Sequence, residues 1–517
     1  MNKFPALAVA SILLASSPLA LVSSSAAAQE KASGDTTPPV PINIGTRREL
    51  FVDDFLIEKL SGVELKLHSP TPREIVMVTD SPWEGAGSAY ATVFRDGDRF
   101  RMYYDACMSI NEDGTNIRDI ADEWFVCYAE SKDGRHWTKP ELGIVEFKGS
   151  KKNNILMNRD MDPTVFKDPN PACRPGEEYK KIQVKWRVGL FALKSSDGIS
   201  WSPLGDKPII TKGVFDSQNI AFWDPIRKQY WAYVRGYDNG KRDTLVATSQ
   251  DFLTWTEPEW LQYGDAPNEQ LYTNQVLPYP RAPHIFMGFP TRYVERGWCP
   301  SFDSLPDPEH RKNRMKRDKG GSGEPRSGLA TTDGLFMTSR DGRTFKRWGE
   351  AFIRPGIERK TNWVYGDCFQ NWGIVETASD DPFAPPELSF YAFEDQWRHP
   401  QHLRRYTLRI DGFVSLHAPH KGGEVLTKPF IFSGKALTLN LSTSAAGNID
   451  IQLLDVENKI PPCKARYIFG DALERVVTWE KGTDISQFAG KPVRLRIEMK
   501  DADLFALRFT DTVEKEK

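Results

Sequence analysis

SKDGRHW, at residues 131–137, is the first copy of a short pattern, Ser-x-Asp-Gly-x-x-aromatic, that returns along this chain. Asp-Gly between β-rich runs is typical of a tight turn, because the turn needs a residue with positive φ. A single copy would indicate a turn and nothing more. Five copies at intervals of several tens of residues indicate a repeated sheet unit. The other copies are SSDGISW at 195–201, SQDFLTW at 249–255, SRDGRTF at 339–345 and, more weakly, RIDGFVS at 409–415.

A second repeat lies before the first three of these turns and sets the order of the strands. In each copy an apolar strand runs into a turn at Asp96, Asp168 or Asp224, and a second strand follows. We interpret these aspartates as structural, because Asp in a turn hydrogen-bonds to nearby backbone. The copies are TVFRDGDRF from residue 92, TVFKDP from 164 and IAFWDPIRK from 220, with looser ones, NQVLPY and NWGIVE, from 274 and 371. The sequence therefore predicts an all-β fold, with a five-bladed β-propeller at residues 45–421.

The character of the chain changes after residue 421. LTLNLSTSAAGNIDIQLLD, RVVTWEKG and VRLRIEMK alternate apolar and polar residues over short runs, which predicts a C-terminal β-sandwich at residues 422–511. Ahead of the first blade lie two further strand-like runs, LFVDDFLIE and VELKLHSP, near Phe51 and Leu65. We expect these runs to close the ring by adding an outer strand to the last blade.

The N-terminal residues 1–28 have the features of a secretory signal peptide. Lys3 supplies the positive charge, an apolar stretch follows, and three alanines precede Gln29. A membrane anchor is the alternative, but serines and Pro18 interrupt the stretch and it is short for a span. Residues 29–44 are expected to be a linker. The predicted location is secreted or periplasmic, with no membrane span after signal removal.

Composition excludes several classes of protein. A net charge of −2 argues against a general nucleic-acid binder, which needs a basic surface to displace counterions. The six cysteines form no CxxC pair, so no zinc site is predicted. We expect no cofactor, with a structural calcium in the propeller channel, held by oxygen ligands, left open.

The repeats and the C-terminal strands together resemble the five-bladed β-propeller glycoside hydrolases of families 32, 43 and 117. The closer resemblance is to family-32-like proteins of polysaccharide-degrading environmental bacteria. It rests on LFVDDFLIEKL, FDSQNIAFWDP, LYTNQVLPYPRAPHIFMGFPTRY, TDGLFMTSRDG and STSAAGNIDIQLLD. The resemblance implies three acidic residues, one at the start of the innermost strand in each of blades one, two and three.

The candidate catalytic residues are Asp216, Asp162 and Glu84. Asp162 matches the Asp-Pro motif of blade two in family 32, and Asp216 lies where that family's blade-three acid falls. Blade one has no Asp at the equivalent place, so Glu84 is taken as its nucleophile or base. Glycosidic cleavage typically needs one acid and one base or nucleophile, and a third carboxylate nearby tunes the pKa of the acid. Asp216 and Asp162 are therefore expected at one mouth of the channel.

Polar residues at the starts of the innermost strands are interpreted as a mouth that binds sugar hydroxyls. The basic insertion at 292–326 is either a solvated loop or a cationic rim for a uronic-acid or sulfated sugar. Its members include Arg314, Arg317 and Lys319. The predicted substrate-binding residues are Tyr90, Asp160, Gln218, Asn219, Asn274, Gln275, Arg292, Asp367, Gln370 and Asn371.

The sequence thus predicts a secreted glycosidase that is exo-acting on an oligosaccharide or polysaccharide, which could be anionic. One alternative is a carbohydrate-binding propeller without catalysis, which the missing blade-one Asp favours. Another is a polysaccharide lyase on the same scaffold, for which Tyr90, His284 and Arg292 supply candidate groups. A phosphorylase is disfavoured, because export removes the protein from a phosphate-rich cytoplasm.

Overall fold

The computed structural model describes residues 40–108, 124–158, 160, 162–316, 326–456 and 462–511. The predicted signal peptide, most of the linker, and Arg317 and Lys319 lie outside the described residues. The chain divides into two units, Met1–Val40 and Pro41–Lys517, and the second holds the fold described below. In the described part, no helix has the length and apolar character that crossing a membrane requires.

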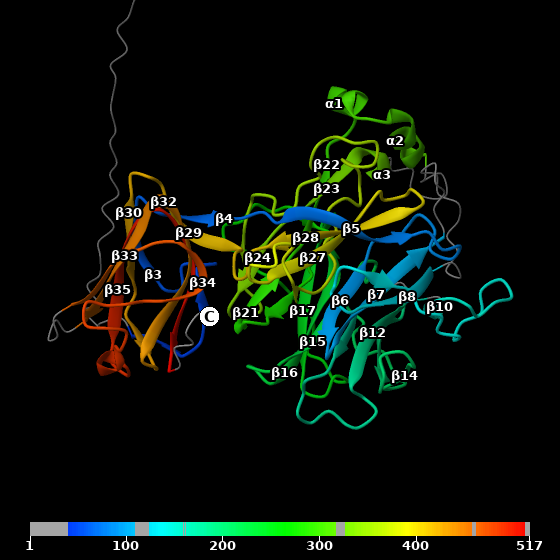
Figure 1. The fold of residues 1–517 in the computed structure, drawn as a ribbon. Helices are drawn as coiled ribbons and strands as arrows, with labels where there is room; N and C mark the ends of the chain where they lie inside the picture. The colour runs from blue at the N-terminus through cyan, green and yellow to red at the C-terminus, as the bar shows by residue number, and fades with distance from the viewer. Residues whose placement is uncertain are drawn as a thin grey trace, which may run out of the picture. The chain divides into compact units, whose positions relative to one another are not determined.

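The described residues are nearly all β, and five antiparallel sheets follow one another along the chain (Figure 1). We call them the repeat sheets. The first contains β6 (Ala91–Asp96), β7 (Arg99–Cys107), β8 (Trp124–Ser131), β9 (Trp137–Thr138) and β10 (Ile155–Asn158). The second contains β11 (Val165–Lys167), β12 (Tyr179–Lys185), β13 (Gly189–Ser195) and β14 (Ser202–Pro203). The third contains β15 (Ile220–Asp224), β16 (Gln229–Asp238), β17 (Lys241–Ser249) and β18 (Glu259–Trp260).

The last two repeat sheets are each completed by strands that are distant in sequence. The fourth contains β20 (Leu277–Tyr279), β21 (Ala282–Gly288), β24 (Met337–Ser339) and β25 (Lys346–Arg347). The fifth contains β26 (Val375–Thr377), β27 (Glu387–Glu394), β28 (Gln401–Leu408) and, from the other end of the chain, β5 (Thr71–Thr79).

The Ser-x-Asp-Gly pattern forms the same turn in the first four repeat sheets, always between the third strand and the next. In the first turn, the Gly134 amide donates to the Ser131 hydroxyl at 2.9 Å. The Asp133 carboxylate accepts from the backbone amides of Arg135 and His136. The fifth, weaker copy follows β28, where the chain leaves for another sheet. The repeat therefore marks one structural position, as the sequence predicted.

One glycine of these turns gives a direct test of the motif. Gly198 is buried with a φ of +78°, and an added Cβ would lie 2.6 Å from the Tyr103 hydroxyl oxygen. Gly240 has a similar φ of +80° but an open surrounding. We expect Gly240→Ala to cost about 1 kcal/mol from backbone strain. Gly198→Ala should cost about 2–4 kcal/mol, because overpacking adds to the strain. Denaturant unfolding measures both, and equal losses would contradict the packing argument.

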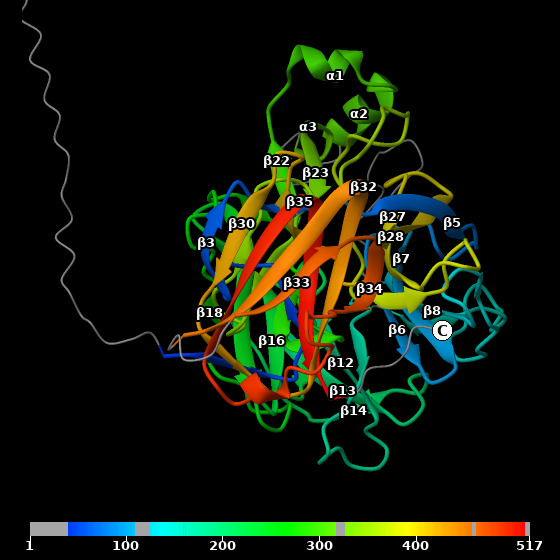
Figure 2. The ribbon, with the colours of Figure 1, turned by 60° about the vertical axis from the view of Figure 1, so that its left-hand side comes forward.

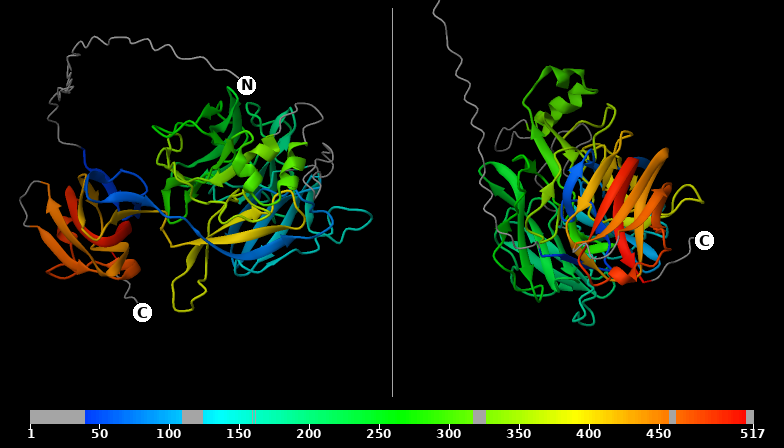
Figure 3. Two further views of the ribbon diagram at one scale, coloured as in Figure 1. Left: turned by 90° about the horizontal axis from the view of Figure 1, so that it is seen from above. Right: turned by 90° about the vertical axis from the view of Figure 1, so that its left-hand side faces the viewer.

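A large sheet joins the first strands of the chain to the last (Figures 2 and 3). It is dominated by the long antiparallel pair β32 (Ala436–Asp455) and β35 (Val493–Thr510). The other members are β1 (Ile42–Gly45), β2 (Glu49–Leu50), β3 (Ile57–Ser61), β4 (Glu64–Leu67), β29 (Val414–Ala418), β30 (Gly423–Thr427), β31 (Phe430–Phe432), β33 (Cys463–Ile468) and β34 (Asp471–Val476).

The expected role of the runs near Phe51 and Leu65 is wrong. β3 pairs with β30 and β4 with β29, whereas β5 is the strand that adds to β28. The cause is burial: Phe51 and Ile57 share one apolar core with Leu437 and Leu495 of the long pair. These strands therefore belong with the C-terminal sheet rather than with the fifth repeat sheet.

The insertion in the fourth repeat sheet is partly helical and partly a small sheet. Its helices are α1 (Pro300–Ser304), α2 (Pro308–Met315) and α3 (Arg326–Leu329). Its strands are β22 (Thr291–Glu295) and β23 (Ala330–Gly334), and β22 also pairs with β19 (Gln270–Leu271), which lies before β20. Arg314 is fully buried and donates to the carbonyl oxygens of Tyr365 and Gln396. Arg311 donates to that of Trp363 at 2.7 Å. Neither interpretation of this segment, as a solvated loop or as a cationic rim, holds for these two arginines. They instead connect α2 to backbone carbonyl oxygens through hydrogen bonds.

Candidate active site

The residues just before the first strands of the repeat sheets contact one another. The Gln275 side-chain amide donates to the Gln218 side-chain oxygen at 2.8 Å and to the Gln370 carbonyl at 2.7 Å. Gln218 in turn donates to Thr92 at 3.1 Å and lies 3.3 Å from the Ala91 carbonyl. Predicted site residues of the third, fourth and fifth repeat sheets therefore meet the first strand of the first repeat sheet at one place, which we call the mouth.

Asp162 joins the mouth from the second repeat sheet. Its Oδ2 accepts from the backbone amide and the side-chain amide of Asn219, both at 3.1 Å. The carboxyl is buried, and burial raises its pKa from 3.8 to about 6. Lys181 opposes this shift, while the neighbouring Asp160 supports it. Asp160 itself forms a buried ion pair with Lys181.

Asp216 is the most exposed of the predicted acids that reach this region. Its side chain is 40% exposed and lies 3.3 Å from the guanidinium of Arg235, whose own side chain is 2% exposed. Arg235 lies over the ring of Tyr272, with 4.3 Å between Cζ and the ring centroid. Its backbone amide donates to Asn219, which connects it to the Asp162 side of the mouth. Asp216 is thus a solvent-reaching carboxylate held by a buried cation.

Asp105 is an acid of the first repeat sheet that sequence reasoning missed. Its Oδ1 accepts from the backbone amides of Ala89 and Tyr90, at 2.9 and 2.7 Å. Burial, helped by the charge of Asp162, raises the pKa of Asp105 to about 7. Its Oδ2 is buried and has no hydrogen-bond partner among the described residues. The signal in the sequence is a single charged residue inside the apolar run MYYDAC, close to Tyr90 once β6 and β7 pair.

Glu84, the predicted acid of the first repeat sheet, lies in a closed network. Its side chain is fully buried and accepts from the Tyr104 hydroxyl at 2.5 Å and from the Ser81 amide at 2.8 Å. Lys139 donates to the same carboxylate at 2.8 Å. This placement favours a structural role for Glu84, because both of its oxygens are already occupied.

Buried polar atoms at the mouth are left without partners among the described residues. They are both side-chain polar atoms of Gln370, both of Asn371, Oε1 of Gln275, Oγ of Ser88, and Nε and Nη2 of Arg235. Asn274 is different, since it donates to the Tyr233 carbonyl and accepts from the Val276 amide. Unpaired buried polar groups are costly and call for an explanation. A polar ligand that pairs with them on binding is such an explanation.

Aromatic rings form one wall beside Asp216. Tyr90 stacks on Phe369, with 6.1 Å between centroids and 16° between planes. Tyr272 contacts the same Phe369 at 5.2 Å, and its hydroxyl accepts from Tyr365 at 2.5 Å. Burial raises the pKa of Tyr90 well above its usual value. The mouth thus combines carboxylates, amides and ring faces, which are the groups that bind sugars.

Two predicted substrate-binding residues have their partners outside the mouth. Arg292 forms a two-pronged ion pair with Asp333 and lies 3.0 Å from Glu269. It lines a hollow of about 920 Å³. Asp367 is buried and accepts from the Val364 amide at 3.1 Å, and burial raises its pKa to about 7. His284, considered for a lyase, pairs with Glu49 at 3.2 Å.

The turn aspartates Asp96, Asp168 and Asp224 lie at the ends of the strands that the mouth residues precede, so they are at the opposite strand ends as expected.

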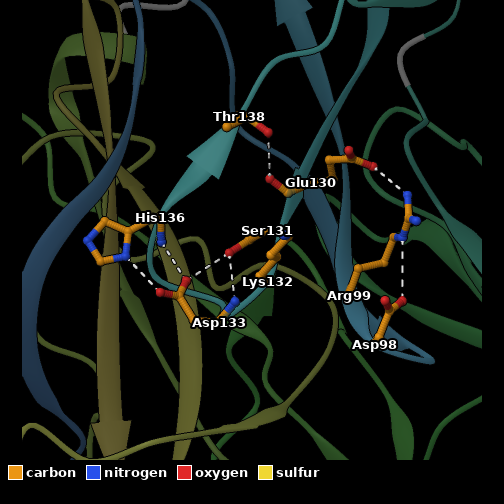
Figure 4. Close-up of a pocket in the computed structure, with 8 residues that line it drawn as sticks. All are labelled: Asp98, Arg99, Glu130, Ser131, Lys132, Asp133, His136 and Thr138. Atoms are coloured by element: carbon orange, nitrogen blue, oxygen red, sulfur yellow. Dashed lines mark hydrogen bonds and ion pairs between the residues drawn. The ribbon is translucent and has the colours of Figure 1, made fainter.

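A smaller pocket of about 340 Å³ surrounds the first Ser-x-Asp-Gly turn (Figure 4). In it the His136 ring contacts Asp133 at 2.7 Å. Among the described residues, no group of three or more His, Cys, Asp or Glu is placed to hold a metal ion.

No family model matches this chain. An uncharacterized protein of Mycobacterium tuberculosis is 27% identical over 140 residues, which are 26% of this chain and 40% of that protein. The chain thus covers less than half of this curated relative.

Solved glycoside hydrolases are similar to the chain at low TM-score and identity. One described as a glycoside hydrolase is 12% identical, with a TM-score of 0.40, covering 66% of this chain and 92% of the other. A glycosyl hydrolase from Bacteroides ovatus is 14% identical, with a TM-score of 0.37 and coverages of 70% and 93%. A family-32 β-fructofuranosidase from Bombyx mori is 9% identical, with a TM-score of 0.37 and coverages of 86% and 95%.

Proposed function

We propose that this chain is a glycoside hydrolase in which the five repeat sheets form a five-bladed β-propeller and the large sheet folds as a C-terminal β-sandwich. The order of the repeat sheets along the chain supports a ring. So do the contacts of β6 with both β11 and β26, which link the first sheet to the second and to the fifth. The pairing of β5 with β28 supports closure of that ring by the N-terminal part of the chain.

The observation that carries the proposed activity is the grouping of Asp105, Asp162 and Asp216 around Tyr90. The Tyr90 amide donates to Asp105, and the charge of Asp162 adds to burial in raising the pKa of Asp105. The charge of Asp216 likewise adds to burial in raising the pKa of the Tyr90 hydroxyl. Glycoside hydrolysis needs one carboxyl group that holds a proton and another that is ionised. These carboxyl groups have different surroundings, as that chemistry requires.

We assign the ionised role, base or nucleophile, to Asp216, because the Arg235 guanidinium pairs with its carboxylate. Asp105 holds the proton as general acid, since its raised pKa lies near neutral pH. Asp162 is the third carboxylate and favours the protonated form of Asp105 through like-charge repulsion. Asp105 is thus the proposed carboxyl group of the first repeat sheet instead of Glu84, but as general acid rather than as nucleophile or base. Asp216 is the proposed base or nucleophile, whereas the resemblance placed it at the blade-three acid.

The proposed substrate is a sugar chain, and the proposed location lies outside the cytoplasm. Amides at the mouth bind sugar hydroxyls, the enzyme is exo-acting on an oligosaccharide or polysaccharide, and it works outside the cytoplasm after loss of residues 1–28. The unpaired polar atoms of amides at the mouth support this role in binding sugar hydroxyls. The substrate-binding residues are Tyr90, Gln218, Asn219, Gln275, Gln370 and Asn371.

A polysaccharide lyase is the second candidate. It is favoured by one observation, the Tyr365–Tyr272 hydroxyl pair beside the Arg235 guanidinium. A lyase uses such a hydroxyl to take a proton next to a carboxylate that a cation neutralises.

One assay separates these functions. The full chain is incubated with a panel of plant and marine oligosaccharides, and products are followed by reducing-end release and by ultraviolet absorbance. A glycosidase releases saturated sugars, as we expect, whereas a lyase gives an unsaturated product that absorbs. Binding without any product would favour the non-catalytic alternative and overturn the proposal.

A further inference from the structure

Three arginines gather on the tyrosine wall beside Asp216. Arg242 lies over two rings, with its Cζ 4.6 Å from the centroid of Tyr293 and 5.4 Å from that of Tyr272. Arg326 lies within electrostatic reach of Tyr293, Tyr272 and Tyr365. With Arg235 over Tyr272, these residues form what we call the arginine–tyrosine cluster: Arg235, Arg242, Arg326, Tyr272, Tyr293 and Tyr365.

The charges of this cluster do not balance. Asp216 neutralises Arg235, but Arg242 donates to a neutral partner, Gln270, at 2.8 Å. Within the described ranges, neither Arg242 nor Arg326 forms an ion pair. Glu295 accepts from the Tyr293 hydroxyl at 3.2 Å. Positive charge therefore exceeds negative charge at the wall of the mouth.

Stacking on tyrosine rings prepares these guanidinium groups to bind an anion. A guanidinium that lies flat on a ring keeps its N–H donors at the edge, in the plane where a carboxylate or sulfate can accept two of them. The ring also fixes the side chain, so less rotamer entropy is lost on binding. Arg235 adds two buried donors, Nε and Nη2, that have no partner among the described residues.

We propose that the arginine–tyrosine cluster is a subsite for an anionic sugar residue, a uronate or a sulfate ester, next to the bond on which Asp216 acts. Arg242 and Arg326 contact the anionic group, and Tyr272 and Tyr365 contact the sugar ring. The inference rests on the proposed function for its position beside Asp216, but binding of the anion does not depend on catalysis.

The β22–β23 pair supplies a matched control. Tyr293 of β22 belongs to the cluster, whereas its neighbours Arg292 and Val294 line the hollow of about 920 Å³ (β22 and β23 are labelled in Figure 2). Successive side chains of a strand point to opposite faces, so the hollow and the cluster lie on opposite sides of this sheet. Arg296 and Arg354 are exposed arginines that also line the hollow. They carry the same charge as Arg242 but lie outside the arginine–tyrosine cluster.

The test measures binding of three probes to the full chain by calorimetry: a galacturonate trisaccharide, a sulfated galactose trisaccharide and unmodified galactotriose. We expect at least one anionic probe to bind about tenfold more tightly than the neutral one, because charge-assisted hydrogen bonds are the stronger kind. This preference should shrink as salt is raised. Arg242→Gln and Arg326→Gln should each lower anionic affinity about tenfold and leave neutral affinity unchanged.

The control variants Arg296→Gln and Arg354→Gln should change neither affinity. The uronate and sulfate probes identify which anion the cluster takes. Equal affinity for neutral and anionic probes, or unchanged anionic affinity in both cluster variants, overturns the inference. If the wild type hydrolyses sugars of the panel but both cluster variants bind the anionic probes as tightly as it does, the inference fails while the glycosidase proposal stands. If anionic probes bind as expected but none of the panel is hydrolysed, the glycosidase proposal fails while the subsite stands.

Discussion

Replacing Asp216 by asparagine is expected to lower kcat by about a hundredfold or more, because the variant lacks the ionised group at the substrate. Asparagine has the same shape and can still accept a hydrogen bond from Arg235, so the melting temperature should change little. The measurement is kcat on the best substrate of the panel, with thermal unfolding alongside. Asp238→Asn is the control, since Asp238 is an exposed aspartate at the C-terminal end of β16, the strand that carries Arg235.

The leaving group separates the role of Asp216 from that of Asp105. A nitrophenyl glycoside needs little protonation as it leaves, so the loss in Asp105→Asn should be much smaller on it than on a natural sugar. The loss in Asp216→Asn should persist on both substrates. Rescue of Asp216→Asn by the nitrophenyl substrate would reverse the two assignments. Full activity of Asp216→Asn on natural sugars would remove Asp216 from the mechanism.

Asp105→Asn is expected to separate stability from activity. The pKa of Asp105 rises from 3.8 to about 7 on folding, so the folded state holds this proton more tightly than the unfolded chain does. Its contribution to stability is therefore complete below about pH 4 and is lost as pH rises to about 7. The loss amounts to at most about 4 kcal/mol, at about 1.4 kcal/mol for each pKa unit.

Asparagine has no proton to lose in this range and keeps the Oδ1 acceptor for the amides of Ala89 and Tyr90. The variant should match the wild type in stability near pH 4 and exceed it increasingly up to pH 7, while kcat falls about a hundredfold. Urea unfolding at several pH values measures the first effect. A difference in stability that does not depend on pH would show that Asp105 ionises in the folded protein as it does in water.

Local features of the fold could be predicted from the sequence, because the chemistry that forms them is local. The Ser-x-Asp-Gly turn closes through hydrogen bonds between Ser131, Asp133 and Gly134, all within a few residues. Its copies therefore located these turns correctly. The positions just before the first strands, such as Gln218 and Gln275, followed from the same register.

Features that depend on distant partners could not be read in this way. Asp105 lies at the mouth because β7 pairs with β6, and Glu84 lies in a closed network because Lys139 reaches it from another segment. Alternation in the runs near Phe51 and Leu65 predicted strands but could not choose between two sheets. The arginines of the insertion looked solvated, since their partners are backbone carbonyls, which no sequence pattern marks.

The sharing of the large sheet between both ends of the chain affects how the protein can be made. β1 pairs with β31 and β3 with β30, so these early strands lack neighbours until nearly the whole chain has been synthesised. Pairing across such a sequence separation is slow, and an unpaired strand edge invites association with other chains. A product that stops at residue 421 would leave β1, β2 and β3 as open edges. Synthesis of β30, β31 and β35, rather than the emergence of each repeat sheet, is thus the step that gives these early strands their neighbours.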